Sequence, residues 1–262
     1  MQFGAELIMS DRNYQYGFSS MHSDSVYDTG MRKQKAQKIL SVLDDYYSGN
    51  LDNLNLIDIG CASGIMSNML STRFANVTGV DIDKEAVDYA VKNFQSDKLR
   101  FKIASGTDLD FPDSSMDVAV CAQVYEHVPD PEKLFSEIYR VLKPGGVCYF
   151  AALNRLRVME PHYRLPFLSL IPKSAAGAYL KVFKKGDSYY ENLLTLWQLK
   201  SLSRKFEIID YTRKVIKDPE KYNATEMLKS GSLKHKLAVQ VAENAYWLCP
   251  TYIWLLRKGK AV

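Results

Sequence analysis

The sequence has no long hydrophobic run. Among its 262 residues no stretch reaches about 18 consecutive apolar residues, the length that a membrane-spanning helix needs. The first ten residues have no basic start and too short an apolar stretch for a secretion signal. We therefore expect a cytoplasmic protein, folded as a single domain over residues 1–262.

Cysteine is scarce and scattered. The four cysteines show no C-x-x-C spacing and no accompanying histidines, which argues against a metal centre or a disulfide framework. Three of them, Cys61, Cys121 and Cys148, fall in or beside apolar runs that read as strands. We expect buried, reduced thiols and no metal site.

The chain also has little net charge. A formal charge of +4 gives no case for nucleic-acid binding by itself. Basic residues nevertheless concentrate in the second half, where they form either a solvated face or a surface attracted to anionic lipid or a phosphate-bearing acceptor. They are Lys173, Lys181, Lys184, Lys185, Lys200, Arg204, Lys205, Arg213, Lys214 and Lys217.

The most informative stretch is residues 54–64, Leu-Asn-Leu-Ile-Asp-Ile-Gly-Cys-Ala-Ser-Gly. It predicts a buried strand that carries Asp58 and runs into a turn with Gly60 and Gly64. A second apolar run begins at Asn76 and ends in acids, with Asp81 following Gly60 by 21 residues. An acid at the end of the next strand is where α/β nucleotide folds bind ribose hydroxyls. The pattern therefore predicts a site for an adenosyl cofactor.

The glycine spacing disfavours a dinucleotide. That fingerprint needs G-x-G-x-x-G, whereas here Gly60, Ala62 and Gly64 are followed by Ile65 and Met66. Asp58 would also repel a pyrophosphate, and it suits a cation such as the α-amino group of a methionine moiety. An NAD-linked oxidoreductase is thus the disfavoured rival.

Strands and helices alternate along the chain. Amphipathic helices are expected at 84–94, 131–142 and 195–205, a shorter helix at 175–185 and a helix from 232, with apolar strands between them. The expected strands are 99–104, 116–122, 147–152, 206–211 and 252–256. This rhythm predicts an α/β fold with a parallel sheet covered on both faces.

Several motifs in order resemble one family. The acid followed by glycines at Asp58–Gly64, the run Glu126-His-Val-Pro-Asp-Pro131 and the run Arg140-Val-Leu-Lys-Pro-Gly-Gly146 resemble the class I S-adenosylmethionine-dependent methyltransferases. Ala62 departs from the family's middle glycine. The resemblance implies S-adenosylmethionine as cofactor and a Rossmann-like, mostly parallel seven-stranded sheet. It also implies that the last strand is antiparallel, between the fifth and sixth.

The resemblance also implies a set of cofactor contacts. Asp58 would face the methionine end, Asp81 the ribose, and backbone groups of Gly106 and Thr107 the adenine edge, where Ser105 replaces an acid that is common in the family. The complete set is Asp58, Gly60, Cys61, Ala62, Gly64, Asp81, Ile82, Ser105, Gly106, Thr107 and Gln123.

The acceptor site is expected above the carboxyl ends of the strands. The insertions 154–190 and 214–248 would form its lid. Within the N-terminal helical region 1–50, Tyr14, Tyr16 and the helix 31–47 could close over the cofactor, or the helix could pack in the core instead. Residues 160–168 are similar to methyltransferases associated with polysaccharide and glycolipid synthesis. This similarity favours a saccharide, glycolipid or related small-molecule acceptor, with peripheral membrane contact a further possibility.

Three residues are candidates for catalysis. A sugar hydroxyl is a poor nucleophile while protonated, so His127, His162 or Glu126 could take its proton, although each could equally hold a loop in place. A C- or N-methyltransferase and a catalytically silent cofactor-binding module remain as alternatives. Methylation of nucleic-acid amino groups is not expected, because Gln123-Val-Tyr-Glu126 replaces the Asn/Asp-Pro-Pro-aromatic run.

Overall fold

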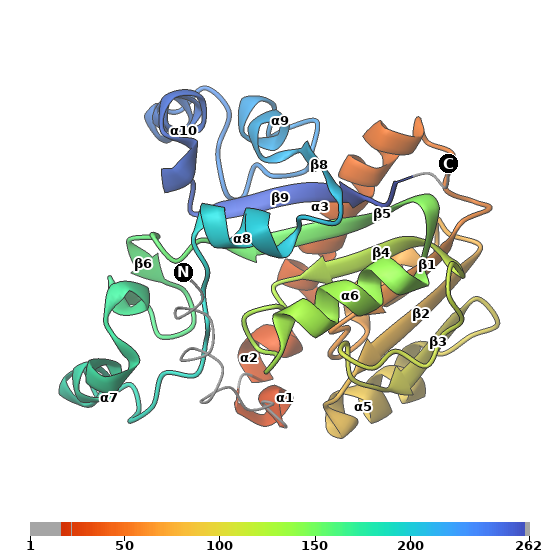
Figure 1. Cartoon of the computed structure of the whole chain (residues 1–262), viewed down its shortest axis with the longest axis horizontal. Coiled ribbons are helices and arrows are strands. Elements are labelled where there is room, and N and C mark those ends of the chain that lie inside the picture. Colours follow the sequence, from red (N-terminus) through yellow and green to blue (C-terminus); the bar gives the residue numbers. More distant parts are fainter. Residues whose placement is uncertain (1–16, 22, 260–262) are drawn as a thin grey trace.

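The computed structural model describes residues 17–259 except His22, and its main element is a seven-stranded sheet (Figure 1). The strands lie in the order β3-β2-β1-β4-β5-β9-β8. Their bounds are β1 Asn55–Ile59, β2 Asn76–Asp81, β3 Leu99–Ile103, β4 Met116–Ala122, β5 Leu142–Leu153, β8 Glu207–Asp210 and β9 Thr251–Arg257.

The pairing of the strands confirms the expected fold class. Strands β1 to β5 pair in parallel, whereas β9 runs antiparallel to both β5 and β8. The last strand therefore lies between the fifth and sixth strands of the sheet, as the family resemblance implied. A small hairpin, β6 Met159–Glu160 with β7 Leu165–Pro166, lies outside this sheet.

Helices cover the sheet on both sides. Alternation along β4 sends Val118 and Val120 into one core and Ala119 and Cys121 into the other, as period-two side chains must. The first core lies under α3, α4 and α5, and the second under α6 and α8. The helices are α1 Phe18–Met21, α2 Ser23–Val26, α3 Thr29–Tyr47, α4 Ile65–Leu70, α5 Lys84–Phe94, α6 Pro131–Val141, α7 Lys173–Val182, α8 Leu196–Leu202, α9 Thr212–Lys217 and α10 Leu233–Asn244.

The largest difference from the sequence-based bounds lies between α6 and β5. The sequence predicts a helix that ends at 142 and a strand that begins at 147, but α6 stops at Val141 and β5 begins directly at Leu142. The ladder between β4 and β5 shifts register between Met116 and Val118, which accommodates the extra residues. Proline and glycine thus lie at the irregular start of a strand.

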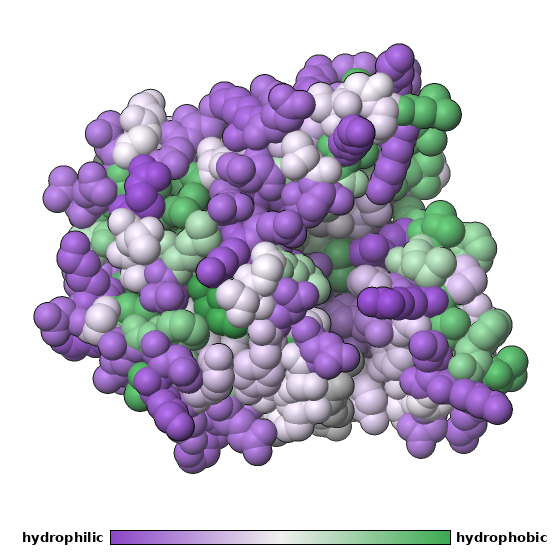
Figure 2. All heavy atoms as spheres, turned by 180° about the vertical axis from the view of Figure 1, so that it is seen from behind, coloured by the Kyte–Doolittle hydropathy of each residue, from purple (hydrophilic) through white to green (hydrophobic). Residues whose placement is uncertain are grey.

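Exposed apolar side chains gather along one edge of the molecule. Figure 2 shows hydrophobic atoms along the side of the surface where α7 and α10 lie. Val182 and Phe183 at the end of α7 are 76% and 48% exposed, and Leu233 at the start of α10 is 84% exposed. Within the described part of the chain, no helix is both long and apolar enough to cross a bilayer.

Candidate functional site

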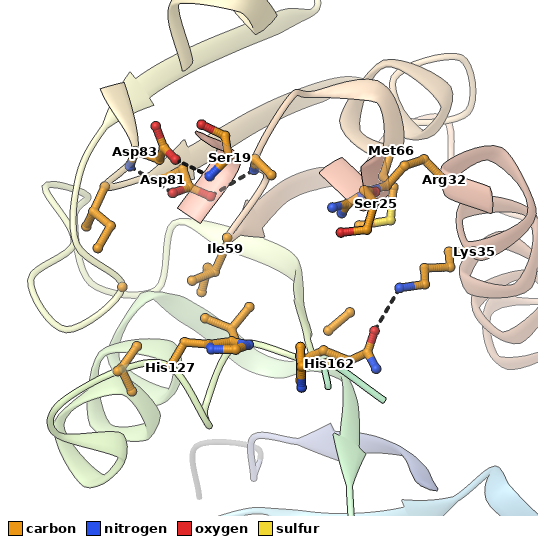
Figure 3. A pocket seen from close by; sticks show the side chains of 18 of the residues that line it. Ser19, Ser25, Arg32, Lys35, Ile59, Met66, Asp81, Asp83, His127 and His162 are labelled. Carbon is orange, nitrogen blue, oxygen red and sulfur yellow. Dashed lines mark hydrogen bonds between the residues drawn. The ribbon is translucent and has the colours of Figure 1, made fainter. Parts of the chain in front are cut away.

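A cavity of about 480 Å³ opens at the carboxyl ends of the parallel strands. Ile59 and Gly60 at the end of β1, Asp81 at the end of β2 and Ala122 at the end of β4 all contribute to its lining. This is the edge at which open α/β sheets bind ligands. Figure 3 shows Asp81 and Ser19 on one side of the cavity and Arg32 and Lys35 on the other, with His127 and His162 below them.

The turn after β1 brings backbone close to the cavity. Gly60, Ala62 and Gly64 all adopt positive φ, at +75°, +47° and +73°. A Cβ on Gly60 would lie 2.5 Å from Val124 Cγ2, so packing as well as backbone conformation requires glycine there. Ala62 accepts the left-handed conformation at a cost of about 1–2 kcal/mol. Its N–H group donates to Asp81 Oδ2 at 2.8 Å, so the strained residue is held in place.

Asp81 is positioned entirely by backbone donors. Its Oδ2 accepts from Ala62, and its Oδ1 accepts from the N–H group of Asp83 at 2.9 Å. Burial raises the pKa of Asp81, although these backbone hydrogen bonds oppose the shift. Because each carboxylate oxygen can accept more than one hydrogen bond, Asp81 can still accept from hydroxyl groups in the cavity.

Asp58 lies behind the cavity wall. Its side chain is buried, and Oδ2 accepts from the hydroxyl of Ser67 at 2.6 Å, while Oδ1 has no hydrogen-bond partner in the described part of the chain. Burial raises the pKa of Asp58 to about 6, against the opposing effects of Ser67 and the positive charge of Arg32. A buried carboxylate with an unused oxygen is stabilised when a cation approaches it.

The N-terminal helices supply site residues that the sequence analysis missed. Arg32 and Lys35, three positions apart on α3, both line the cavity, and Arg32 Nε donates to the carbonyl of Ser25 at 3.1 Å. Burial lowers the pKa of Arg32, which the charges of Asp58 and Asp81 oppose. Lys35 Nζ donates to Gln123 Oε1 at 2.8 Å, and burial lowers the pKa of Lys35 to about 8.

The rest of α3 packs in the core, so this helix has two roles. The i, i+3 spacing of Arg32 and Lys35 indicates in the sequence that two cations share one helix face, but not that this face meets the cavity. Tyr14 and Tyr16 lie outside the described residues.

Two histidines meet at the other end of the cavity. The rings of His127 and His162 lie edge to face, with centroids 5.4 Å apart, and both line the cavity. His162 Nδ1 hydrogen-bonds Glu160 Oε1 at 2.7 Å. Burial alone would lower the pKa of His162, but that bond and the charge of Glu191 raise it overall. Glu126 is fully buried just behind, where burial raises its pKa to about 7.

The structure brings most of the predicted site residues to this cavity. Those that line it are Gly60, Ala62, Asp81, Ile82, Gly106, Gln123, His127 and His162. The others are not among the lining residues: Asp58, Cys61, Gly64, Ser105, Thr107 and Glu126. From the insertion 154–190, Pro161 and Arg164 also reach the lining. The lid role of the two insertions stays a prediction.

The sequence and the fold were compared with known proteins. Residues 57–150 match the model of a family described as a methyltransferase domain. Over 158 residues the chain is 27% identical to a ubiquinone biosynthesis O-methyltransferase of Hydrogenovibrio crunogenus, with 59% of this chain and 62% of that protein aligned. A protein of the same name from Actinobacillus pleuropneumoniae is 35% identical over 107 residues, which are 38% of this chain and 46% of that protein.

The chain thus spans about half to two thirds of the length of these two relatives. Among solved structures, a geranyl diphosphate methyltransferase in complex with SAM superimposes with a TM-score of 0.51 at 16% identity. That superposition covers 87% of this chain and 85% of the other. At this low identity, the likeness supports the fold alone.

Proposed function

We propose that this chain, in which residues 57–150 form a methyltransferase domain, transfers a methyl group from S-adenosylmethionine to a hydroxyl of a small-molecule acceptor. The observation that carries the proposal is Asp81, fixed by two backbone donors at the edge of the cavity beside the glycine turn. The O-methyltransferase names of the two relatives support a hydroxyl acceptor.

The residues around the cavity suit the ribose, the adenine and the methionine parts of this cofactor. Asp81 would accept from the ribose hydroxyls, and Ile82 and Gly106 would contact the adenine. At the methionine end, Arg32 offers a guanidinium to the carboxylate, and the unpartnered oxygen of Asp58 favours the cationic groups. A cavity of about 480 Å³ is within the range of cofactor pockets. When bound, S-adenosylmethionine supplies an activated methyl carbon.

The protein's own part is to position the acceptor and take up its proton. Holding two reacting groups in line is worth roughly 7–11 kcal/mol of barrier. His127 and His162 line the acceptor end, and an imidazole within reach of a hydroxyl can accept its proton. Glu126, buried behind them, is better placed to stabilise this loop than to touch the acceptor.

For the class of acceptor, the proposal is a saccharide or a lipid-linked molecule. It is supported by the apolar side chains of Val182 and Phe183, exposed beside Lys181, Lys184 and Lys185. Apolar anchors next to lysines suit a protein that works at an anionic membrane surface. The segment that carries these side chains belongs to the same insertion, 154–190, as His162. Contact of this insertion with a membrane would therefore bring the cavity close to a lipid-linked acceptor.

Calorimetry with S-adenosylmethionine, its demethylated product and NAD tests the cofactor. We expect binding of the first two and none of NAD. Asp81→Ala should weaken binding roughly 10- to 100-fold, because hydrogen bonds to a charged group are worth about 1.5–3 kcal/mol. Asp110→Ala, which removes a carboxylate that is 96% exposed, is the matched control. Unchanged affinity in Asp81→Ala, or tighter binding of NAD, would remove the proposal's support.

The same measurement with adenosine separates the two ends of the site. Asp81→Ala should weaken adenosine binding as well, whereas Arg32→Met should weaken only ligands that carry the methionine carboxylate. Lys33→Met, one position along on the exposed face of α3, controls for the loss of a positive charge. Turnover with labelled cofactor and a panel of hydroxyl, amine and carbon acceptors then identifies the acceptor class.

A further inference from the structure

Three potential metal ligands converge behind the acceptor end of the cavity. One ligand atom from each of Glu160, His162 and Glu191 lies within 4.8 Å of the other two. Glu160 ends β6, His162 lies in the turn that follows, and Glu191 lies in the extended segment before α8. The fold of the insertion therefore brings together residues that lie up to 31 positions apart.

The imidazole in this cluster is held in a fixed orientation. Glu160 Oε1 pairs with His162 Nδ1 at 2.7 Å, and Glu160 Oε2 accepts from the backbone N–H of Tyr163 at 2.8 Å. A metal ion bound by both side chains would replace the hydrogen bond between them, because metal ligands bind in their deprotonated form. His162 also lines the cavity, so the cluster and the cavity share this side chain.

Buried carboxylate oxygens without partners surround the imidazole. Glu191 is 2% exposed, and among the described residues its Oε2 has no hydrogen-bond partner; the same holds for both oxygens of fully buried Glu126. Glu126 interacts electrostatically with both His162 and Glu191. Unpartnered buried carboxylates are costly unless a cation compensates them.

Protein cations also lie near these carboxylates. Arg157 interacts with Glu160 and Glu126, and Lys173 with Glu191. The ammonium of Lys173 donates to the carbonyls of Tyr189 and Tyr190, so it is shared with those groups. Lys35 also interacts with Glu126, so three protein cations lie near the three carboxylates, while Glu191 Oε2 and both carboxylate oxygens of Glu126 have no hydrogen-bond partner among the described residues.

The geometry points to a binding site for a divalent transition-metal ion, formed by Glu160, His162 and Glu191. A ligand set of one imidazole and two carboxylates suits Zn²⁺ or Mn²⁺ better than Mg²⁺ or Ca²⁺. Three protein ligands leave a coordination position open on the metal ion. Because His162 also lines the cavity, this open position would lie near the acceptor. Only the nearness of the metal to an acceptor rests on the proposed function. A metal site here differs from the sequence-based expectation of no metal.

Metal titration of the full chain tests the site directly. The protein, without a polyhistidine tag, is treated with chelator, dialysed and titrated calorimetrically with Zn²⁺, Mn²⁺ and Mg²⁺. We expect one Zn²⁺ or Mn²⁺ per chain and much weaker binding of Mg²⁺. Glu191→Gln keeps the shape of the side chain and removes a ligand charge, so it should weaken binding by roughly 10- to 100-fold or more.

Two further variants make the result decisive. His235→Gln removes a distant imidazole that bonds the carbonyl of Ile216 and should bind metal as the wild type does. If Glu191→Gln no longer binds S-adenosylmethionine, and so has not folded, His162→Gln takes its place. Stoichiometric binding that survives both Glu191→Gln and His162→Gln would overturn the site. A wild-type protein that binds S-adenosylmethionine but neither Zn²⁺ nor Mn²⁺ overturns it too, while the proposed function stands.

Discussion

Two aspartates near the cavity, the buried Asp58 and the partly exposed Asp81, are stabilised in different ways. Asp81 accepts backbone hydrogen bonds at both oxygens, whereas among the described residues Asp58 accepts only from Ser67 and has one unused oxygen. The backbone donors hold Asp81 in one orientation before any ligand binds. The carboxylate of Asp58 instead carries a desolvation cost that a nearby positive charge offsets. The ionisation of Asp58 should therefore be coupled to the binding of a cationic ligand.

This coupling predicts a pH dependence of cofactor affinity. Burial in the folded protein raises the pKa of Asp58 to about 6, so the ligand-free folded state holds this proton more tightly than the unfolded chain. A cationic ligand favours the ionised form, so affinity should rise with pH through about 6 and fall by up to about tenfold per unit below it. The ligand-free protein shows the opposite trend: the stability contributed by protonated Asp58 is lost as pH rises through about 6.

Calorimetry between pH 5 and pH 8 measures this trend. Asp58→Asn should bind the cofactor more weakly than the wild type at high pH, and its affinity should change less with pH. A smaller dependence of the same sign should remain because the pKa of Asp81 is also raised. Asp52→Asn, on an exposed loop, should follow the wild-type curve. A profile of Asp58→Asn parallel to that of the wild type would contradict the assigned coupling.

Sequence alone could predict the sheet and its motifs, because both depend on local patterns. Helix α5 at Lys84–Phe94 has the bounds that its apolar spacing predicted, and Asp58 and Asp81 follow from strand ends. The antiparallel last strand came from family resemblance, since pairing direction has no local signature. Arg32 and the cluster around Glu191 could not be predicted in this way, because each joins the site only through tertiary packing of a distant segment.

At the scale of elements, the turn between β1 and α4 depends on Gly64 for two separable reasons. Its φ is +73°, and an added Cβ would lie 2.6 Å from Ala90 Cβ and 2.7 Å from the ring of Phe101. Gly49 after α3 has a φ of +80° but no atom within 4 Å of an added Cβ. The two glycines therefore form a natural comparison.

Urea unfolding of Gly49→Ala and Gly64→Ala should resolve the two costs. We expect Gly49→Ala to lower the free energy of unfolding by about 1–2 kcal/mol, the cost of the left-handed backbone alone. Gly64→Ala should lose about 1–3 kcal/mol more, because the new methyl group forces α4, α5 and β3 apart. Equal losses in both variants would mean that the core accommodates the methyl group freely.

At the scale of the whole molecule, the apolar end of α7 and its lysines should act as one surface. In flotation assays we expect association with anionic vesicles, weaker at high salt, since each nearby lysine contributes on the order of 1 kcal/mol. Replacing Val182 and Phe183 together by serine should reduce association, whereas Ile103→Ser at the end of β3, on a side chain 54% exposed at the other edge of the sheet, is the control. Absence of salt-sensitive flotation, with full activity on a soluble acceptor, would refute the membrane proposal and leave the methyltransferase proposal intact.

The position of β9 has a consequence for how the protein is made. Strand β8 touches the sheet only through β9, and β9 is translated some 40 residues later. On the ribosome, β1 to β5 can pair as they emerge, while β5 keeps an open edge and β8 has no neighbour. Until residues 251–257 leave the exit tunnel, that open edge is the part of the nascent chain most exposed to misassembly, and the place where a chaperone would be most useful.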